Sequence, residues 1–169
     1  TGDGADTLTS IENVTGSAFD DTLGGTAGNN ILDGGAGTDT VSYAAATAAV
    51  TVDLAAGTAT GDGTDTLISI ENVIGSAFND TLGGNAGNNV LDGGDGIDTV
   101  SYAASAGAIA ADLGAGTVTG ADGTDSLIGI ENLIGSAFDD LLAVEVPACH
   151  PLHAVHVQVE PGVLEGGDP

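Results

Sequence analysis

The stretch GGAGTDTVS, residues 34–42, returns 59 residues later as GGDGIDTVS, residues 93–101. Both follow the pattern G-G-x-G-x-D-x-U-x, in which U is a large aliphatic residue. Glycine tolerates positive φ, so the first four residues can form a tight turn whose carbonyl oxygens point at a common centre. The Asp adds a charged oxygen, and the aliphatic residue can bury its side chain between two packed ribbons. Oxygen ligands of these two kinds suit a hard cation such as calcium.

Further nine-residue units abut these two in the same register. Stepping back nine residues at a time from Val41 reaches Leu32 and then Leu23, which divides residues 16–42 into GSAFDDTLG, GTAGNNILD and GGAGTDTVS. The same three units recur over residues 75–101 as GSAFNDTLG, GNAGNNVLD and GGDGIDTVS. Six units in one register indicate a repeat architecture.

In this register the chain resembles the RTX, or hemolysin-type, calcium-binding repeat family. The resemblance implies an all-β fold: a right-handed parallel β-roll, or β-solenoid, in which two nonapeptides complete one coil. It also implies Ca²⁺ as the cofactor, clamped between stacked loops by position-six carboxylates and by carbonyl oxygens of the glycine turns. The resemblance is silent about any activity elsewhere in a longer protein.

Two nonapeptides per coil place alternate loops on the same edge of the roll. Asp21 and Asp39 are therefore expected on one edge, one coil apart, while Asn30 and Glu12 share the opposite edge. The second copy repeats this arrangement, with Asp80 beside Asp98 and Glu71 on the edge of Asn89. We expect the aspartate edges to bind calcium better, because an amide oxygen brings no compensating charge. The predicted ligands are Asp21, Asp39, Asp80, Asp98, Asp140, Gly34, Gly35, Gly37, Gly93, Gly94, Gly96, Asn30 and Asn89, with Glu12, Glu71, Asp62, Asp65, Asp122 and Asp125 as weaker candidates.

Two groups of residues depart from the complete motif. The GSAF loops have Ser at position two and Phe at position four, and we expect Phe19, Phe78 and Phe138 to cover ends of roll segments. The weaker Asp candidates lie in G-D-G-x-D turns, or the A-D-G-x-D variant at Asp122, and are either calcium ligands or partners in Asx hydrogen bonds.

A larger repeat encloses the nonapeptides. The element IENV at residues 11–14 recurs at 70–73, and IENL follows at 130–133. The predicted units are copy 1 at 1–60, copy 2 at 61–119, an interrupted copy 3 at 120–142, and a divergent, poorly structured tail at 143–169. Residues 68–74 are expected to form one strand. The Ala-rich runs at 44–49 and 103–111 predict either a variant rung of the solenoid or a short helix.

The composition is strongly acidic, with 25 Asp and Glu, no Lys or Arg, and a formal charge of −25. A compact state of one charge sign repels itself, so we expect bound metal to supply the missing cations; a solvated acidic face is the alternative. The charge excludes a basic nucleic-acid footprint and attraction to anionic membranes, and no apolar run is long enough for membrane insertion. The chain begins inside a repeat, which predicts an excerpt that stacks on neighbouring repeats of a longer parent.

The chain offers little for catalysis or transition-metal binding. Cys149 and the three His residues lie in the tail, where two Pro residues oppose a helix that would gather them. Repeated acids without a registered His or Cys partner are more often structural than catalytic, so we expect no enzyme activity.

The resulting hypothesis is a secreted or cell-surface module of bacterial type that folds when it meets calcium outside the cell. Binding of metal to the folded state alone would make the binding free energy a folding free energy. In the family that the chain resembles, this switch accompanies type I secretion. The parent is expected to be a surface adhesin with these repeats as a stalk, or a secreted hydrolase, protease or toxin with the roll as its folding module. A solenoid held by aliphatic stacking alone, indifferent to calcium, is the third reading.

Overall fold

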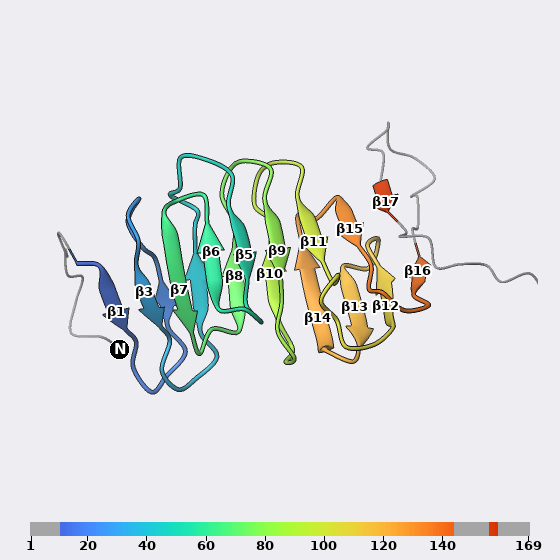
Figure 1. The fold of residues 1–169 in the computed structure, drawn as a ribbon, viewed down its shortest axis with the longest axis horizontal. Helices are drawn as coiled ribbons and strands as arrows, with labels where there is room; N and C mark the ends of the chain where they lie inside the picture. Colours follow the sequence, from blue (N-terminus) through green and yellow to red (C-terminus); the bar gives the residue numbers. More distant parts are fainter. Residues whose placement is uncertain (1–10, 144–155, 159–169) are drawn as a thin grey trace, which may run out of the picture.

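The computed structural model describes residues 11–143 and the backbone of 156–158. Within these residues the regular structure consists of short β-strands without any helix, and the strands stack along one axis from β1 (Asn13–Thr15) at one end to β15 and β16 at the other (Figure 1). The all-β prediction is confirmed. The described part of the chain offers no helix that is long and apolar enough to cross a membrane. Most of the predicted tail lies outside the described residues.

The strands form two sheets, and most connections pass from one sheet to the other. The first sheet has the order β1, β3 (Ile31–Asp33), β7 (Thr64–Ile68), β6 (Thr58–Thr60), β5 (Thr51–Asp53), β9 (Thr81–Gly83), β11 (Thr99–Ser101), β15 (Asn132–Ile134) and β17 (His156–Gln158). The second has the order β16 (Leu141–Ala143), β12 (Ile109–Asp112), β13 (Thr117–Gly120), β14 (Gly123–Ile128), β10 (Val90–Asp92), β8 (Asn72–Ile74), β4 (Thr40–Ser42) and β2 (Thr22–Leu23).

The nonapeptide strands pair in parallel with a register of 18 residues, which is two nonapeptides per coil. The aliphatic residue at position eight of each unit therefore stacks on its equivalent one coil away, and these residues form the core between the sheets. Leu32, Val41, Leu82, Leu91 and Val100 are all 0% exposed. The paired residues include Val14 with Leu32, Leu23 with Val41, Val73 with Leu91, and Leu82 with Val100.

The segment after each third nonapeptide forms an antiparallel excursion instead of one variant rung. In copy 1, β5 pairs antiparallel with β6 and β6 pairs antiparallel with β7. The reversals use Gly57, at φ 66°, and Gly61 and Gly63, at φ 115° and 100°, backbone conformations that favour glycine. The Ala-rich run at 44–49 forms a turn that leads into this excursion, so neither a helix nor a simple rung forms there.

The IEN element breaks the single strand predicted over residues 68–74. β7 ends at Ile68 and β8 begins at Asn72, so residues 69–71 are a turn that crosses between the sheets. Ser69 has φ 51°, and it is the one non-glycine residue with positive φ in the described chain. Gly129, with φ 59°, occupies the equivalent position in the next copy. A left-handed residue at this point ends one strand and redirects the chain.

Successive copies are related by a half turn about the long axis. β1, β8 and β15 are the same element in three copies, and they lie in the first, second and first sheet, respectively. Likewise, the first excursion lies in the first sheet, whereas β12, β13 and β14 lie in the second. The alternation arises because one copy contains an odd number of crossings between the sheets. Equivalent loops of consecutive copies therefore lie on opposite edges of the roll.

Substitutions of two neighbouring residues of β10 test which face of the strand packs in the core. Leu91→Ala should lower the free energy of unfolding by about 2–5 kcal/mol, because Leu91 is 0% exposed and its truncation leaves a cavity. Val90→Ala should cost less than about 1 kcal/mol, because Val90 is 37% exposed on the outer face of the same strand. Chemical denaturation at saturating calcium measures both. Equal losses would contradict the assignment of the two faces.

Candidate metal centre

Carboxylate side chains link successive loops along what we call the first edge, which includes loops 16–21 and 34–39 and the turn 69–71. The backbone N–H of Asp21 donates to Oδ1 of Asp39 over 2.7 Å. The N–H of Asp39 donates in turn to Oε2 of Glu71 over 2.8 Å. Three acids from three successive coils thus form one column at this edge.

The opposite, or second, edge repeats this column one copy later. It includes loops 75–80 and 93–98 and the turn 129–131. The N–H of Asp80 donates to Oδ1 of Asp98 over 2.7 Å, and the N–H of Asp98 donates to Oε2 of Glu131 over 2.8 Å. The two columns lie on opposite edges because consecutive copies differ by the half turn described above.

Sequence reasoning placed part of these columns. It put Asp21 beside Asp39 and Glu71 on the edge of Asn89, and the amide Nδ2 of Asn89 does donate to the carbonyl oxygen of Glu71 over 2.7 Å. It missed that Glu71 and Glu131 reach the aspartate loop of the preceding copy. Their spacing from that loop, 32 and 33 residues, is not a multiple of 18, because the antiparallel excursion intervenes. The number of crossings between the sheets in each copy would have predicted that these two glutamates reach the aspartate loops.

Asp39 and Asp98 each have one buried oxygen atom without a hydrogen-bond donor. Both side chains are 0% exposed, and their Oδ2 atoms are the buried side-chain oxygens or nitrogens that lack a partner in the described chain. An ionised carboxylate oxygen in such a place is costly unless something positive or protic meets it. These two residues belong to the two nonapeptides that carry the complete glycine motif.

The other nonapeptides satisfy this oxygen internally. Their position-six side chain accepts the N–H of position two over 2.5–2.9 Å. In the complete motifs the N–H of position two donates to a different acceptor. Gly35 donates to Oδ1 of Asp33, and Gly94 donates to Oδ1 of Asp92, each over 3.1 Å. The internally satisfied residues are Asp21, Asn30, Asp80, Asn89 and Asp140.

A backbone carbonyl faces each free carboxylate oxygen. A Cβ atom built on Gly34 would lie 2.5 Å from Oδ2 of Asp39 and would also overlap the carbonyl oxygen of Ser69. The equivalent Cβ on Gly93 would lie 2.5 Å from both Oδ2 of Asp98 and the carbonyl oxygen of Gly129. The carbonyl oxygen and the carboxylate oxygen therefore both lie close to the Cα atom of the same glycine, and a side chain at that position would collide with them.

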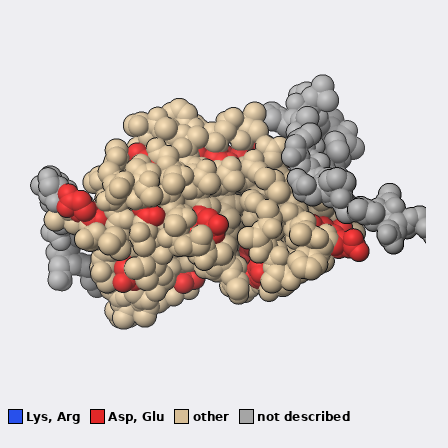
Figure 2. All heavy atoms as spheres, viewed as in Figure 1, with Lys and Arg blue, Asp and Glu red and all other residues tan. Residues whose placement is uncertain are grey.

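The electrostatics of this space favour a cation. Burial raises the pKa of Asp98 above its ordinary value, and the charges of Asp80, Glu131 and Asp92 raise it further, against the hydrogen bond from the Asp80 N–H. Acidic side chains are spread along the face shown in Figure 2, and the sequence contains no Lys or Arg to neutralise them. A carboxylate oxygen opposed by a carbonyl oxygen matches the ligands of calcium. Three Asp, Glu, His or Cys side chains do not gather at one point within residues 11–143, so a cation here would also take main-chain oxygens.

Asp80 and Asp140 have both oxygens occupied by protein donors. Oδ1 of Asp80 accepts the N–H of Val50 and the hydroxyl of Ser76, each over 2.7 Å, and Oδ2 accepts the Ser76 N–H. Burial raises the pKa of Asp140, but hydrogen bonds from the Ser136 hydroxyl and from the N–H groups of Ile109 and Ser136 outweigh it and leave the pKa below its ordinary value. Ser at position two thus supplies donors where the complete motif has glycine.

Asp65 and Asp125 join neighbouring coils through buried tyrosines. Oδ1 of Asp125 accepts the N–H of Asn89 over 2.9 Å, and Oδ2 accepts the hydroxyl of Tyr102 over 2.6 Å. Asp65 makes the equivalent bonds to Asn30 and Tyr43. Burial raises the pKa of Asp125, whereas the Tyr102 hydrogen bond lowers it. The sequence analysis did not identify either tyrosine as a partner of these acids.

The remaining predicted residues lie apart from the free oxygens. Glu12 is exposed, while Asp62 and Asp122 lie in half-buried turns. Gly37 and Gly96 have φ 142°, and a Cβ on either would overlap the backbone of the Phe one coil away. The three Phe residues do not cover the ends of roll segments: Phe19, Phe78 and Phe138 are 78%, 44% and 52% exposed on the edges, because position four points outward from the loop.

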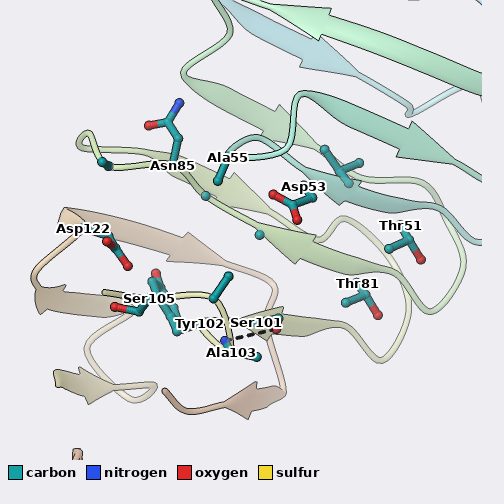
Figure 3. A pocket seen from close by; sticks show the side chains of 15 residues that line it. Thr51, Asp53, Ala55, Thr81, Asn85, Ser101, Tyr102, Ala103, Ser105 and Asp122 are labelled. Carbon is teal, nitrogen blue, oxygen red and sulfur yellow. Dashed lines mark hydrogen bonds between the residues drawn. The ribbon is translucent and has the colours of Figure 1, made fainter. Parts of the chain in front are cut away.

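A hollow of about 300 Å³ lies beside β5 and β9 and is also lined by residues 84–86 and 101–105 and by Asp122 of the third copy (Figure 3). Its lining includes Asp53, Thr81, Asn85, Tyr102 and Asp122. Neither Asp39 nor Asp98 belongs to that lining. The candidate metal positions are therefore the narrow spaces beside the free carboxylate oxygens, separate from this hollow.

The fold and the loops define the class of protein: a parallel β-roll whose turns stack acidic and carbonyl oxygens along two edges. A comparison with family models matches the RTX calcium-binding nonapeptide repeat in four copies, within residues 11–45 and 60–100. These residues therefore match the RTX repeat family, and the β-roll that they form is of a calcium-binding type. No curated protein matches the chain.

Removing a tyrosine hydroxyl tests the Asp125 junction. Tyr102→Phe should lower the free energy of unfolding by about 1–3 kcal/mol at neutral pH, because a buried carboxylate oxygen loses its donor. The hydrogen bond favours the ionised form, so its contribution is present above the folded-state pKa of Asp125 and declines as the pH falls through that value. Denaturation curves across acidic pH measure this decline. A loss that is constant with pH would contradict an ionised Asp125 as the partner.

Proposed function

We propose that this chain is a structural module that binds Ca²⁺ at Asp39 and Asp98 and needs the ion to fold. The observation that carries the proposal is the buried Oδ2 atom of each residue, which faces a carbonyl oxygen and has no donor. Only the two complete motifs have this feature among the described nonapeptides. The proposal therefore assigns one principal calcium position to each complete motif.

Folding and calcium binding are coupled in this proposal. The folded chain brings carboxylates of successive coils together, and no basic side chain offsets their repulsion. Calcium binds the stacked arrangement and not the open chain, so its binding free energy stabilises the fold. The expected dissociation constant is on the order of 10⁻⁴ to 10⁻³ M, which is typical of extracellular calcium modules.

With an affinity in this range, the chain would be folded outside the cell. Inside, calcium is too scarce to load such sites, so the chain would stay open; outside, it would load and fold. We propose a secreted or cell-surface protein of bacterial type, in keeping with the type I secretion of the family that the sequence resembles. Any catalytic domain of the parent lies, in this proposal, beyond these repeats.

The stacking of copies favours a stalk or spacer of a surface adhesin. Each copy continues the same two sheets after a half turn, so further copies can extend the roll along the same axis. A folding module beside a secreted hydrolase, protease or toxin domain is the rival role. The sequence flanking these residues in the parent distinguishes them, because a stalk requires more copies and a folding module requires a neighbouring catalytic domain.

The calcium-indifferent solenoid also has support, because most position-six side chains are satisfied by the protein itself. It predicts the same β signal in chelator as in calcium. The calcium-dependent proposal predicts a cooperative gain of β signal with calcium but not with magnesium, measured by far-UV circular dichroism.

Substitution of the two free carboxylates tests the proposal directly. The double variant Asp39→Asn, Asp98→Asn keeps an oxygen for the N–H groups of Asp21 and Asp80 but removes both charges. Its folding midpoint should need at least about 10-fold more calcium, because affinity follows the charge of the ligands. Asp95→Asn is the matched control, since Asp95 is an exposed residue of the same loop. Equal midpoints for the double variant and the control would overturn the assignment.

A further inference from the structure

We infer that each calcium ion is shared between consecutive copies, with a nonapeptide loop of one copy and the IEN turn of the next as its two sides. On the first edge the ligands are Oδ2 of Asp39, the carbonyl oxygen of Ser69 and the carboxylate of Glu71. On the second edge they are Oδ2 of Asp98, the carbonyl oxygen of Gly129 and the carboxylate of Glu131. This inference rests on the proposed function, because it names the ligands of the same ions.

The two oxygens of Asp39 have different neighbours. Oδ1 accepts the N–H of Asp21, so the side toward the preceding nonapeptide loop already has a donor. Oδ2 has no donor and lies beside the carbonyl oxygen of Ser69. The free coordination position therefore opens toward the next copy and not toward the loop of Asp21.

The turn of the next copy is shaped to present its carbonyl. Ser69 adopts φ 51°, a left-handed conformation that is unfavourable for residues with a Cβ atom. Gly129 adopts the same conformation without that cost, and its carbonyl oxygen takes the same place beside Asp98. A strained residue that aims a carbonyl at a buried carboxylate has a functional reason if a cation lies between them.

The glutamate of the same turn supplies the second negative charge. Oε2 of Glu71 accepts the N–H of Asp39, which fixes the Glu71 carboxylate against the loop of Asp39. Glu131 makes the same bond to the N–H of Asp98 and its charge acts directly on the Asp98 carboxylate. The two acids of each site repel one another until a cation binds.

The position of each site gives the ion a specific task. Asp39 and Glu71 flank the excursion formed by β5, β6 and β7, and Asp98 and Glu131 flank the excursion formed by β12, β13 and β14. An ion at each site joins the two ends of a segment of about 30 residues. The entropic cost of bringing the ends of a segment together grows with its length, so the ion offsets a larger cost here than in a short turn. Calcium would thus bind consecutive copies to one another, on alternating edges of the roll.

The experiment is calcium titration of the full chain by isothermal calorimetry, with circular dichroism to verify the fold at saturation. Glu71→Gln and Glu131→Gln keep an oxygen for the Asp39 and Asp98 N–H groups and remove the charge. Because folding couples the two sites, each substitution should raise the calcium concentration needed for the folded state, as expected for an affinity loss of about 10-fold or more at the substituted site. Glu12→Gln is the matched control, because Glu12 belongs to the same IEN element but is exposed. Asp21→Asn tests the opposite side of the Asp39 loop.

The outcomes separate this inference from the proposed function. Weakening by Glu71→Gln and Glu131→Gln, with no effect of Glu12→Gln or Asp21→Asn, supports a site shared between copies. Loss of binding in Asp21→Asn, with Glu71→Gln equal to the control, places the ion between two nonapeptide loops and overturns the inference while calcium binding stands. An absence of calcium binding by the unsubstituted chain overturns the proposed function itself.

Discussion

The roll depends on burying carboxylates along both edges of a chain that has no basic side chain to meet them. Backbone N–H groups of the adjacent coil are the main donors available, and Asp39 and Asp98 each accept one. A buried carboxylate needs a compensating charge and a hydrogen-bond partner for each of its oxygens. One N–H group provides a partner for only one oxygen and does not neutralise the charge. For the Oδ2 atoms of Asp39 and Asp98, the described part of the protein provides no hydrogen-bond donor.

One position in the nonapeptide separates two kinds of loop. Where position two is Ser17, Ser76 or Ser136, its N–H closes back on the position-six carboxylate of its own loop. Where it is glycine, as at Gly35 and Gly94, the Asp two residues earlier accepts that N–H. The first kind is complete without metal and holds the register of the roll. The second leaves one buried carboxylate oxygen without a donor, and this is the oxygen at which we propose that calcium binds.

The antiparallel excursions set the long-range geometry. They add strands to one sheet in copy 1 and to the other sheet in copy 2, so that neither sheet outgrows its partner over two copies. They also bring Glu71 and Glu131 to loops more than 30 residues earlier in the chain. Burial of Val52 and Ala59 in the first excursion, and of Ala111 and Val118 in the second, continues the aliphatic core through these segments. The contact between consecutive copies therefore combines apolar packing with the close approach of negatively charged side chains.

The sequence alone determined the nonapeptide register, the all-β class, the likeness to a repeat family and the shared edge of Asp21 with Asp39. A period of nine fixes which residues face inward and which loops coincide. It did not determine the antiparallel excursions or the turn at Ser69. Alanine-rich segments have no periodic signal of their own, and a left-handed Ser leaves no mark in composition. Tertiary structure decided which oxygens remain free and which glutamates accept the N–H groups of Asp39 and Asp98. Those facts depend on where a hydrogen atom of a backbone amide points, and on the number of sheet crossings between residues distant in the chain.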